Sequence, residues 1–235
     1  MIGRLADHVV ESRGAAVGTG AAVVAMAGPV SVGKSSLAAE LAAALADRSL
    51  VTEVVSTDGF LHPNAWLTER DLMARKGFPE SYDTAALLAF VDAARRAPAG
   101  LAVPEYSHVT YDVVPVPERV LGSCDVLVVE GVNALSATQG GVDLAVYVDA
   151  APEVVEAWYV ERFLRLCTDP APDSFFVRFA ELDRDARIDL ARWTWRSVNV
   201  PNLTEHIGPS RRFAHVVVEK GPDHGIARIV DLRAA

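Results

Sequence analysis

Residues 28–35 read Gly28-Pro29-Val30-Ser31-Val32-Gly33-Lys34-Ser35, which is the G-x-x-x-x-G-K-S pattern of a phosphate-binding loop. The glycines of this pattern let successive backbone amides, and the start of the following helix, face an anion. We expect the Lys34 ammonium to reach the β- and γ-phosphates of a nucleotide triphosphate and the Ser35 hydroxyl to bind Mg²⁺. The stretch predicts a nucleotide site that includes Gly28, Ser31, Gly33, Lys34 and Ser35.

The flanking residues favour this interpretation over a chance glycine- and serine-rich turn. The apolar run 21–27 is typical of a buried parallel strand, and 36–48 places Leu37, Leu41 and Leu45 on one face of a helix. Strands alternating with helices predict an α/β fold of the P-loop NTPase type, a doubly wound, mainly parallel sheet with helices on both faces. Further strands are expected at 51–56, 125–131, 144–149, 214–219 and 226–232, and helices at 84–96, 152–166 and over most of 173–195.

Composition indicates a folded protein of modest size. The chain has 235 residues, of which 51% are hydrophobic, so we expect a single domain over 1–235. The formal charge of −9 argues against a nucleic-acid partner. No apolar run approaches the length of a membrane span, and Cys124 and Cys167 lack metal-type spacing, so a cytoplasmic location is the expectation. A polar, flexible stretch is expected at 61–82, where Pro63, Gly77 and Pro79 interrupt regular structure.

Two carboxylates stand at predicted strand ends, where ligands bind in open α/β sheets. Asp58, in Thr57-Asp58-Gly59, is the candidate base that orients or deprotonates an acceptor hydroxyl, although Asp-Gly is also a common turn pair. Glu130 follows a run of apolar residues and is the candidate ligand of Mg²⁺ or of a water bound to it, the alternative being a cap.

Other polar and aromatic residues are ambiguous from chemistry alone. Tyr106, His108 and Tyr111 are consistent with a small-molecule pocket or with ordinary packing. Tyr159 and Arg162 share one helical face, and Arg162 fits either a cation for phosphoryl transfer or a surface salt bridge. Asn199 and its neighbour Asn202 are expected in a loop.

Taken in order, these segments resemble the prokaryotic (type I) pantothenate kinase family, a branch of the P-loop kinases that includes uridine kinase and phosphoribulokinase. Residues 57–64 (Thr-Asp-Gly-Phe-Leu-His-Pro-Asn) and 76–83 (Lys-Gly-Phe-Pro-Glu-Ser-Tyr-Asp) carry the most distinctive matches. The resemblance runs from about Val23 to Arg233. Its other segments are 28–36, 106–112, 130–133, 147–150, 158–164, 173–176, 199–203 and 220–224.

The resemblance implies ATP-dependent, Mg²⁺-assisted phosphorylation of pantothenate to 4'-phosphopantothenate, the first step of coenzyme A biosynthesis. Asp58 would be the base, Glu130 would lie by the metal, and Arg162 would stabilise the transferring phosphoryl group. Lys34, Ser35 and Ser36 would hold the triphosphate, and His224 matches a histidine at the nucleotide end. The positions that match pantothenate and lid residues of the family are Tyr106, His108, Tyr111, Tyr159, Phe163, Phe176 and Asn199.

The sequence also departs from the family. The helical segment that precedes the first strand in the family is reduced to a short N-terminal helical stub at 1–20, which leaves the adenine contacts open. The resemblance also implies substrate or lid loops at 61–82 and 104–118. The stretch between Asn133 and Val142 is also abbreviated. Ala39 replaces an arginine that contacts the phosphates of the feedback inhibitor coenzyme A, so we expect weak or absent feedback. Leu166 replaces a phenylalanine on the pantothenate side. Family members are dimers, so a homodimer is consistent with the resemblance, but the sequence leaves the oligomeric state open.

Two other functions are consistent with the sequence. The first is a paralogue that phosphorylates a nucleoside or another small alcohol; the abbreviated N-terminus and Leu166 favour it, whereas the retained Tyr106, His108, Tyr159 and Asn199 argue against it. The second is a nucleotide-binding regulatory protein without turnover. Retention of the whole candidate catalytic set argues against that reading. That set comprises Lys34, Ser35, Asp58, Glu130 and Arg162.

Overall fold

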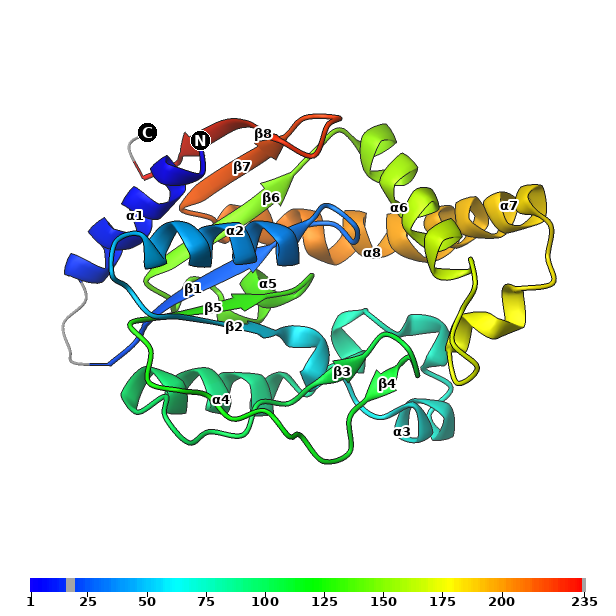
Figure 1. The fold of residues 1–235 in the computed structure, drawn as a ribbon, viewed down its shortest axis with the longest axis horizontal. Helices are drawn as coiled ribbons and strands as arrows, with labels where there is room; N and C mark the ends of the chain where they lie inside the picture. The colour runs from blue at the N-terminus through cyan, green and yellow to red at the C-terminus, as the bar shows by residue number, and fades with distance from the viewer. Residues whose placement is uncertain (16–19, 234–235) are drawn as a thin grey trace.

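The computed structural model describes residues 1–15 and 20–233, which contain a six-stranded sheet in the order β2-β5-β1-β6-β7-β8 (Figure 1). Neighbouring strands are parallel except β7 and β8, which are antiparallel. The predicted doubly wound, mainly parallel sheet is therefore confirmed. Its strands are β1 (Ala22–Ala27), β2 (Thr52–Ser56), β5 (Val126–Glu130), β6 (Leu144–Asp149), β7 (Val216–Lys220) and β8 (Ile226–Asp231), and a separate hairpin pairs β3 (Tyr106–Ser107) with β4 (Asp112–Val113).

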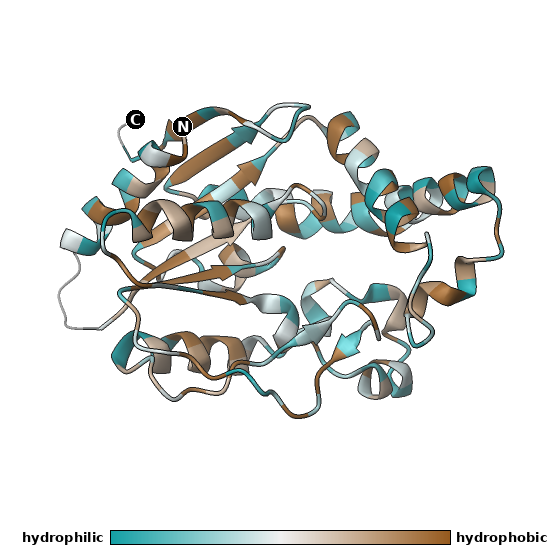
Figure 2. Ribbon diagram, in the orientation of Figure 1, coloured by the Kyte–Doolittle hydropathy of each residue, from teal (hydrophilic) through white to brown (hydrophobic). Residues whose placement is uncertain are grey.

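Helices cover both faces of the sheet because the central strands are apolar on both sides. All six residues of β1 are buried: Val24 and Met26 pack on one face, whereas Val23 and Ala25 pack on the other. Figure 2 shows mostly hydrophobic strands between helices that carry both hydrophobic and hydrophilic residues. The α-helices are α1 (Ile2–Ala15), α2 (Lys34–Ala46), α3 (Asn64–Glu69), α4 (Thr84–Arg96), α5 (Ala134–Thr138), α6 (Pro152–Leu166), α7 (Arg184–Thr194) and α8 (Val200–Asn202).

The predicted N-terminal stub corresponds to α1, which packs beside α2 through the buried residues Leu5, Ala6 and Val9. Residues 16–19 of the predicted range 1–20 lie outside the described residues. No helix in the described ranges is long and apolar enough to cross a membrane.

The prediction of one helix over most of 173–195 is wrong in its first half. Residues Phe175–Phe179 form a 3₁₀ turn, and α7 begins only after Asp183, whose carboxylate accepts a hydrogen bond from the Ala186 amide at 2.8 Å. Because an N-cap residue has non-helical backbone angles, Asp183 separates the two segments.

The expectation that Asn199 and Asn202 lie in a loop is also wrong. The chain stays helical from α7 to Phe213, with π-helical turns at Trp195–Asn199 and Leu203–Ile207. Pro201 and Pro209 have no amide hydrogen to donate, so the regular hydrogen-bond pattern is interrupted while the chain keeps its helical course.

The predicted loops at 61–82 and 104–118 are more ordered than expected. The first contains α3, which begins directly after Pro63, and 3₁₀ turns at Met73–Arg75 and Pro79–Ser81. The second contains the β3–β4 hairpin. Proline is well tolerated at or before the first turn of a helix, so Pro63 and Pro79 start elements here rather than preventing them.

Gly131 allows the ends of β5 and β2 to approach each other. A Cβ atom at Gly131 would lie 1.7 Å from Oγ1 of Thr57, which is fully buried and begins the 3₁₀ turn Thr57–Phe60. We expect Gly131→Ala to lower the free energy of unfolding by about 1–3 kcal/mol, measured by urea denaturation. Gly122→Ala is the matched control, because its Cβ would meet only Glu53 Oε1 at 3.5 Å. Equal stability of the two variants would contradict this close approach.

Candidate active site

The loop 28–33 connects β1 to α2 and carries the two glycines that the phosphate-binding pattern requires, directly before the start of the helix. Gly33 has φ +86°, and a Cβ there would lie 2.8 Å from Nζ of Lys220. The Ser31 hydroxyl oxygen is buried and has no hydrogen-bond partner within the described residues. The Lys34 ammonium donates to the carbonyls of Gly28, at 3.1 Å, and Pro29, at 2.8 Å. A glycine-dependent loop, an unsatisfied hydroxyl and a buried cation fit a triphosphate.

A carboxylate faces this loop from the end of β5. Ser35 Oγ donates to Glu130 Oε1 at 2.9 Å. Burial raises the pKa of Glu130, and the Lys34 ammonium opposes that shift. Burial also lowers the pKa of Lys34, while Glu130 and Asp58 favour its charged form. Hydroxyl and carboxylate oxygens are ligands that suit Mg²⁺, which takes its remaining ligands from phosphates and water.

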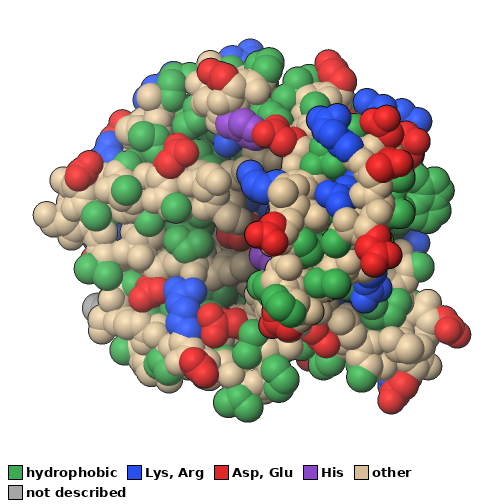
Figure 3. Space-filling view, turned by 45° about the vertical axis from the view of Figure 1, so that its right-hand side comes forward, with side chains coloured by type: hydrophobic (Ala, Val, Ile, Leu, Met, Phe, Trp, Pro, Cys, Tyr) green, Lys and Arg blue, Asp and Glu red, His purple; other side chains and the backbone are tan. Residues whose placement is uncertain are grey.

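A cavity of about 330 Å³ opens from the phosphate loop toward α6 and α7. Pro29, Val30 and Ser31 form one end of it, and Asp58 lies on its wall. Figure 3 shows the hollow on this face of the molecule, with acidic and histidine side chains visible inside it. Asp58 therefore borders the same cavity as the phosphate-binding loop, and this cavity is large enough for a small-molecule acceptor.

Asp58 is positioned by the turn that follows β2. Its amide donates to Ser56 Oγ at 3.3 Å, and the Tyr82 hydroxyl donates to Asp58 Oδ1 at 3.2 Å. Tyr82 is buried, and its place is fixed by the bridge to Leu61 and by the adjacent Asp83 amide, which donates to the Phe60 carbonyl at 2.8 Å.

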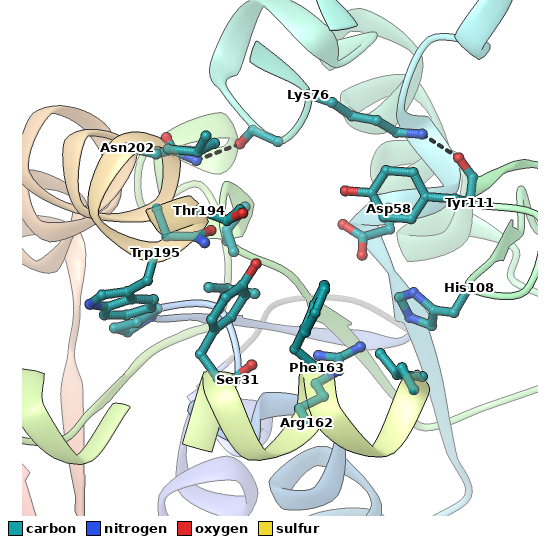
Figure 4. Close-up of a pocket in the computed structure, with 18 of the residues that line it drawn as sticks. Ser31, Asp58, Lys76, His108, Tyr111, Arg162, Phe163, Thr194, Trp195 and Asn202 are labelled. Carbon is teal, nitrogen blue, oxygen red and sulfur yellow. Dashed lines mark hydrogen bonds between the residues drawn. The ribbon is translucent and has the colours of Figure 1, made fainter. Parts of the chain in front are cut away.

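The β3–β4 hairpin forms an aromatic wall beside Asp58 (Figure 4). The Tyr106 ring lies 5.2 Å from His108 and 6.0 Å from Tyr111, both edge to face. Burial, followed by the charge of Arg162, lowers the pKa of His108, so its imidazole is neutral at pH 7. A neutral imidazole accepts as well as donates a hydrogen bond, which suits a hydroxyl ligand.

The opposite wall comes from α6 and the helix beyond α7. Arg162 and Phe163 point into the cavity from α6, and Trp195 and Asn202 face them from the later helix (Figure 4). Arg162 has no ion pair within the described residues, and its charge acts on Lys34 and His108. This placement disfavours the surface salt bridge weighed for Arg162.

The structure brings most of the predicted site residues together. The following predicted residues line the cavity: Ser31, Asp58, Tyr106, His108, Tyr111, Tyr159, Arg162, Phe163, Phe176 and Asn199. Gly28, Gly33, Lys34, Ser35, Ser36 and Glu130 belong to the adjoining phosphate loop, the start of α2 and the end of β5.

His224 does not line this cavity. It lies in the turn between β7 and β8 and stacks on Trp158, with ring centroids 4.0 Å apart. Sequence reasoning missed Lys76, Tyr82, Trp195 and the role of Asn202 as a wall residue. The signal for Lys76 and Tyr82 is the segment 76–83 itself, which carries one of the two most distinctive matches to the family.

The family assignment rests on three comparisons. Residues 23–165 match the model of the phosphoribulokinase / uridine kinase family. A protein named pantothenate kinase from Myxococcus xanthus is 45% identical over 88% of this chain and 70% of its own length. One of the same name from Clavibacter michiganensis subsp. michiganensis is 44% identical over 88% of this chain and 69% of its own. A solved structure provisionally assigned as a fructose transport system kinase from Silicibacter sp. TM1040 superposes with a TM-score of 0.71 at 25% identity, covering 87% of this chain and 92% of that one. The chain therefore belongs to the phosphoribulokinase / uridine kinase family, within its pantothenate kinase branch.

Proposed function

We propose that this kinase transfers the γ-phosphoryl group of ATP to the primary hydroxyl of pantothenate, giving 4'-phosphopantothenate and ADP, the first step of coenzyme A biosynthesis. The observation that carries the proposal is one continuous cavity that contacts the phosphate loop at Ser31, the candidate base Asp58 and the aromatic hairpin. The names of the relatives at 38–45% identity support the choice of acceptor.

In the proposed reaction, Asp58 accepts the hydroxyl proton while the acceptor oxygen forms its bond to the γ-phosphorus. The bond between that phosphorus and the β,γ-bridging oxygen breaks, and ADP leaves. Lys34 and Arg162 balance the negative charge that develops on the phosphoryl oxygens. Mg²⁺, held by Ser35 and by Glu130 directly or through water, would neutralise charge on the β- and γ-phosphates.

The cavity also suits the acceptor chemically. Pantothenate has a hydroxylated end, an apolar gem-dimethyl carbon, an amide and a carboxylate. Asp58 and His108 supply polar groups to the cavity, whereas Phe163 and Phe176 supply apolar surface. Asn199 and Tyr159 lie together on the opposite wall, where an amide and a phenol are able to bind the polar tail.

The direct test measures ADP release by purified protein with Mg-ATP and pantothenate, uridine, cytidine, an N-substituted pantothenamide or no acceptor. The expected result is turnover with pantothenate well above the acceptor-free rate. Turnover only with a nucleoside would mean that the same catalytic residues act on another acceptor, and it would overturn the proposed substrate. No turnover with any acceptor, together with retained ATP binding, would favour a regulatory nucleotide-binding protein.

Tyr82→Phe is expected to reduce kcat by about 5- to 15-fold, because the lost hydrogen bond to Asp58 is typically worth about 1–1.5 kcal/mol. The Phe ring keeps the packing, so the KM for ATP should stay unchanged. Steady-state kinetics with Tyr147→Phe as control tests this, since Tyr147 is buried in β6 and does not line the cavity. Equal losses in both variants would point to a general structural effect instead.

Feedback inhibition by coenzyme A is expected to be weak. Ala39 is an exposed residue of α2, one turn beyond Ser35, and its methyl group offers no charge to a phosphate. Initial rates at subsaturating ATP with increasing coenzyme A test this, and Ala39→Arg is expected to strengthen inhibition. Potent inhibition of the unaltered protein, competitive with ATP, would contradict the prediction.

Two further proposals concern the chain as a whole. Both hydrophobic clusters lie against the same sheet, so we propose that residues 1–235 form one cooperative domain, and a single coincident unfolding transition by fluorescence and circular dichroism would support this. A homodimer is consistent with the family resemblance and stays a prediction, which light scattering of the purified protein tests.

A further inference from the structure

Lys76 and Gly77 lie between the two walls of the cavity. Lys76 Nζ donates to the Tyr111 carbonyl at 2.6 Å and to Asn64 Oδ1 at 2.6 Å, which ties the segment 61–82 to the β3–β4 hairpin. On the other side, Asn202 Nδ2 donates to the Gly77 carbonyl at 2.8 Å (Figure 4). One dipeptide thus connects the hairpin with the helix that follows α7.

The hairpin needs such a support because its backbone is strained at one point. Tyr111 has φ +57°, a left-handed conformation that costs free energy for a non-glycine residue. Its carbonyl accepts hydrogen bonds from Lys76 and, at 2.9 Å, from Asn64 Nδ2. The Lys76 ammonium also lies 4.9 Å from the centre of the Tyr106 ring and 4.5 Å from that of Tyr111, within cation–π range.

We propose that Lys76 is a positioning residue: its ammonium holds Tyr106, His108 and Tyr111 of the hairpin in place beside Asp58. This inference rests on the proposed function for its kinetic consequences, because those three residues form the acceptor wall. Lys76 borders the same cavity, but both of its hydrogen bonds go to the protein, so its role is exerted through the hairpin.

We call the contacts of the Lys76 ammonium with Asn64, Tyr106 and Tyr111 the Lys76 clamp. These contacts depend on the positive charge of Lys76 and therefore on pH. Burial lowers the pKa of Lys76 to about 8, against the opposing effects of Asp112 and Asp58. The other titratable groups facing it are the phenols of Tyr106, whose pKa burial raises well above 10, and Tyr111, whose pKa burial raises to about 12. As pH rises through about 8, the ammonium loses its proton, and the cation–π contacts and the charge-assisted hydrogen bonds weaken. Acceptor kcat/KM should therefore fall between pH 7 and 9.

The kinetic test compares Lys76→Met, Lys76→Arg and the unaltered chain across that pH range. We expect Lys76→Met to lose about 10- to 100-fold in kcat/KM for the acceptor, mainly through KM, with no change in the KM for ATP. It should lack the inflection near pH 8, while Lys76→Arg recovers part of the activity and stays flat because a guanidinium keeps its charge. Arg70→Met, an exposed cation on the same segment, should keep the original profile.

Two results would overturn the proposal: an unchanged acceptor KM in Lys76→Met, with or without a loss in kcat, or an inflection near pH 8 that persists without Lys76. A loss confined to kcat would mean that Lys76 acts on the transferring group itself.

Hydrogen exchange tests the clamp without any substrate. The Val114 amide donates to the Glu105 carbonyl at 2.8 Å and closes the hairpin. Amides of 105–114 should exchange several-fold faster in Lys76→Met than in the unaltered chain, and Asn64→Ala should act in the same direction if Lys76→Met fails to fold. Unchanged exchange in a folded variant overturns the clamp. Faster exchange combined with no pantothenate turnover by the unaltered chain would uphold the clamp and reject the proposed substrate.

Discussion

Asp58→Asn is expected to lower kcat by about 10²- to 10⁴-fold, the range associated with loss of a general base. The amide keeps the shape of the carboxylate, and its oxygen still accepts the hydrogen bond from the Tyr82 hydroxyl. Unlike the carboxylate, the amide has no basic oxygen that takes the proton of the acceptor hydroxyl. Single-turnover kinetics with Mg-ATP and pantothenate measures the chemical step, and fluorescence titration or calorimetry should give an unchanged dissociation constant for ATP.

The matched control for this variant is Asp92→Asn, which alters an exposed carboxylate paired with Arg96 on α4. Its rate should equal that of the unaltered protein. If Asp58→Asn retained more than a tenth of the activity, Asp58 would be a turn residue, the alternative that the Asp-Gly sequence left open.

Arg162→Met should reduce kcat by about 10³-fold or more, as removal of an arginine from a phosphoryl-transfer site does in related chemistry. Arg162 is half-buried, borders the cavity and has no carboxylate partner within the described residues, so its charge is available to the transferring group. Because the interaction develops in the transition state, the loss should appear in kcat, with little change in the KM values.

Arg165→Met provides the control, since Arg165 is exposed in the last turn of the same helix. Stopped-flow or quench-flow measurement of ADP formation distinguishes the two variants. A large increase in the KM for ATP with an intact kcat would assign Arg162 to nucleotide binding in the ground state, against the role proposed for it.

The parts of the fold that the sequence predicts well are those determined by local pattern. The loop 28–35 with its flanking strand and helix, and the apolar strands β5 and β6, appear where composition and periodicity placed them. The site residues on these elements, such as Lys34 and Glu130, follow directly, because the carboxyl ends of parallel strands meet at one edge.

The parts that were missed depend on contacts between distant segments. Tyr82 reaches Asp58 across 24 positions of sequence, and Asn202 reaches Gly77 across 125. Neither contact leaves a periodic signal. Proline and asparagine near 199–203 locally resemble a loop, whereas in the fold the stretch is helical and its flanking residues Trp195 and Ile207 are buried in the two hydrophobic clusters.

The cavity draws its lining from loops, turns, helices and the small hairpin; within the described residues, no strand of the six-stranded sheet contributes to it. The buried hydrophobic clusters that stabilise the fold pack on the sheet, whereas the acceptor would contact segments attached to the edge of the sheet. Such a division makes the protein evolvable: mutations that reshape the acceptor pocket leave the central packing intact, and so incur little penalty in folding. Kinases of this architecture are thereby free to diversify in what they phosphorylate while retaining how they do so.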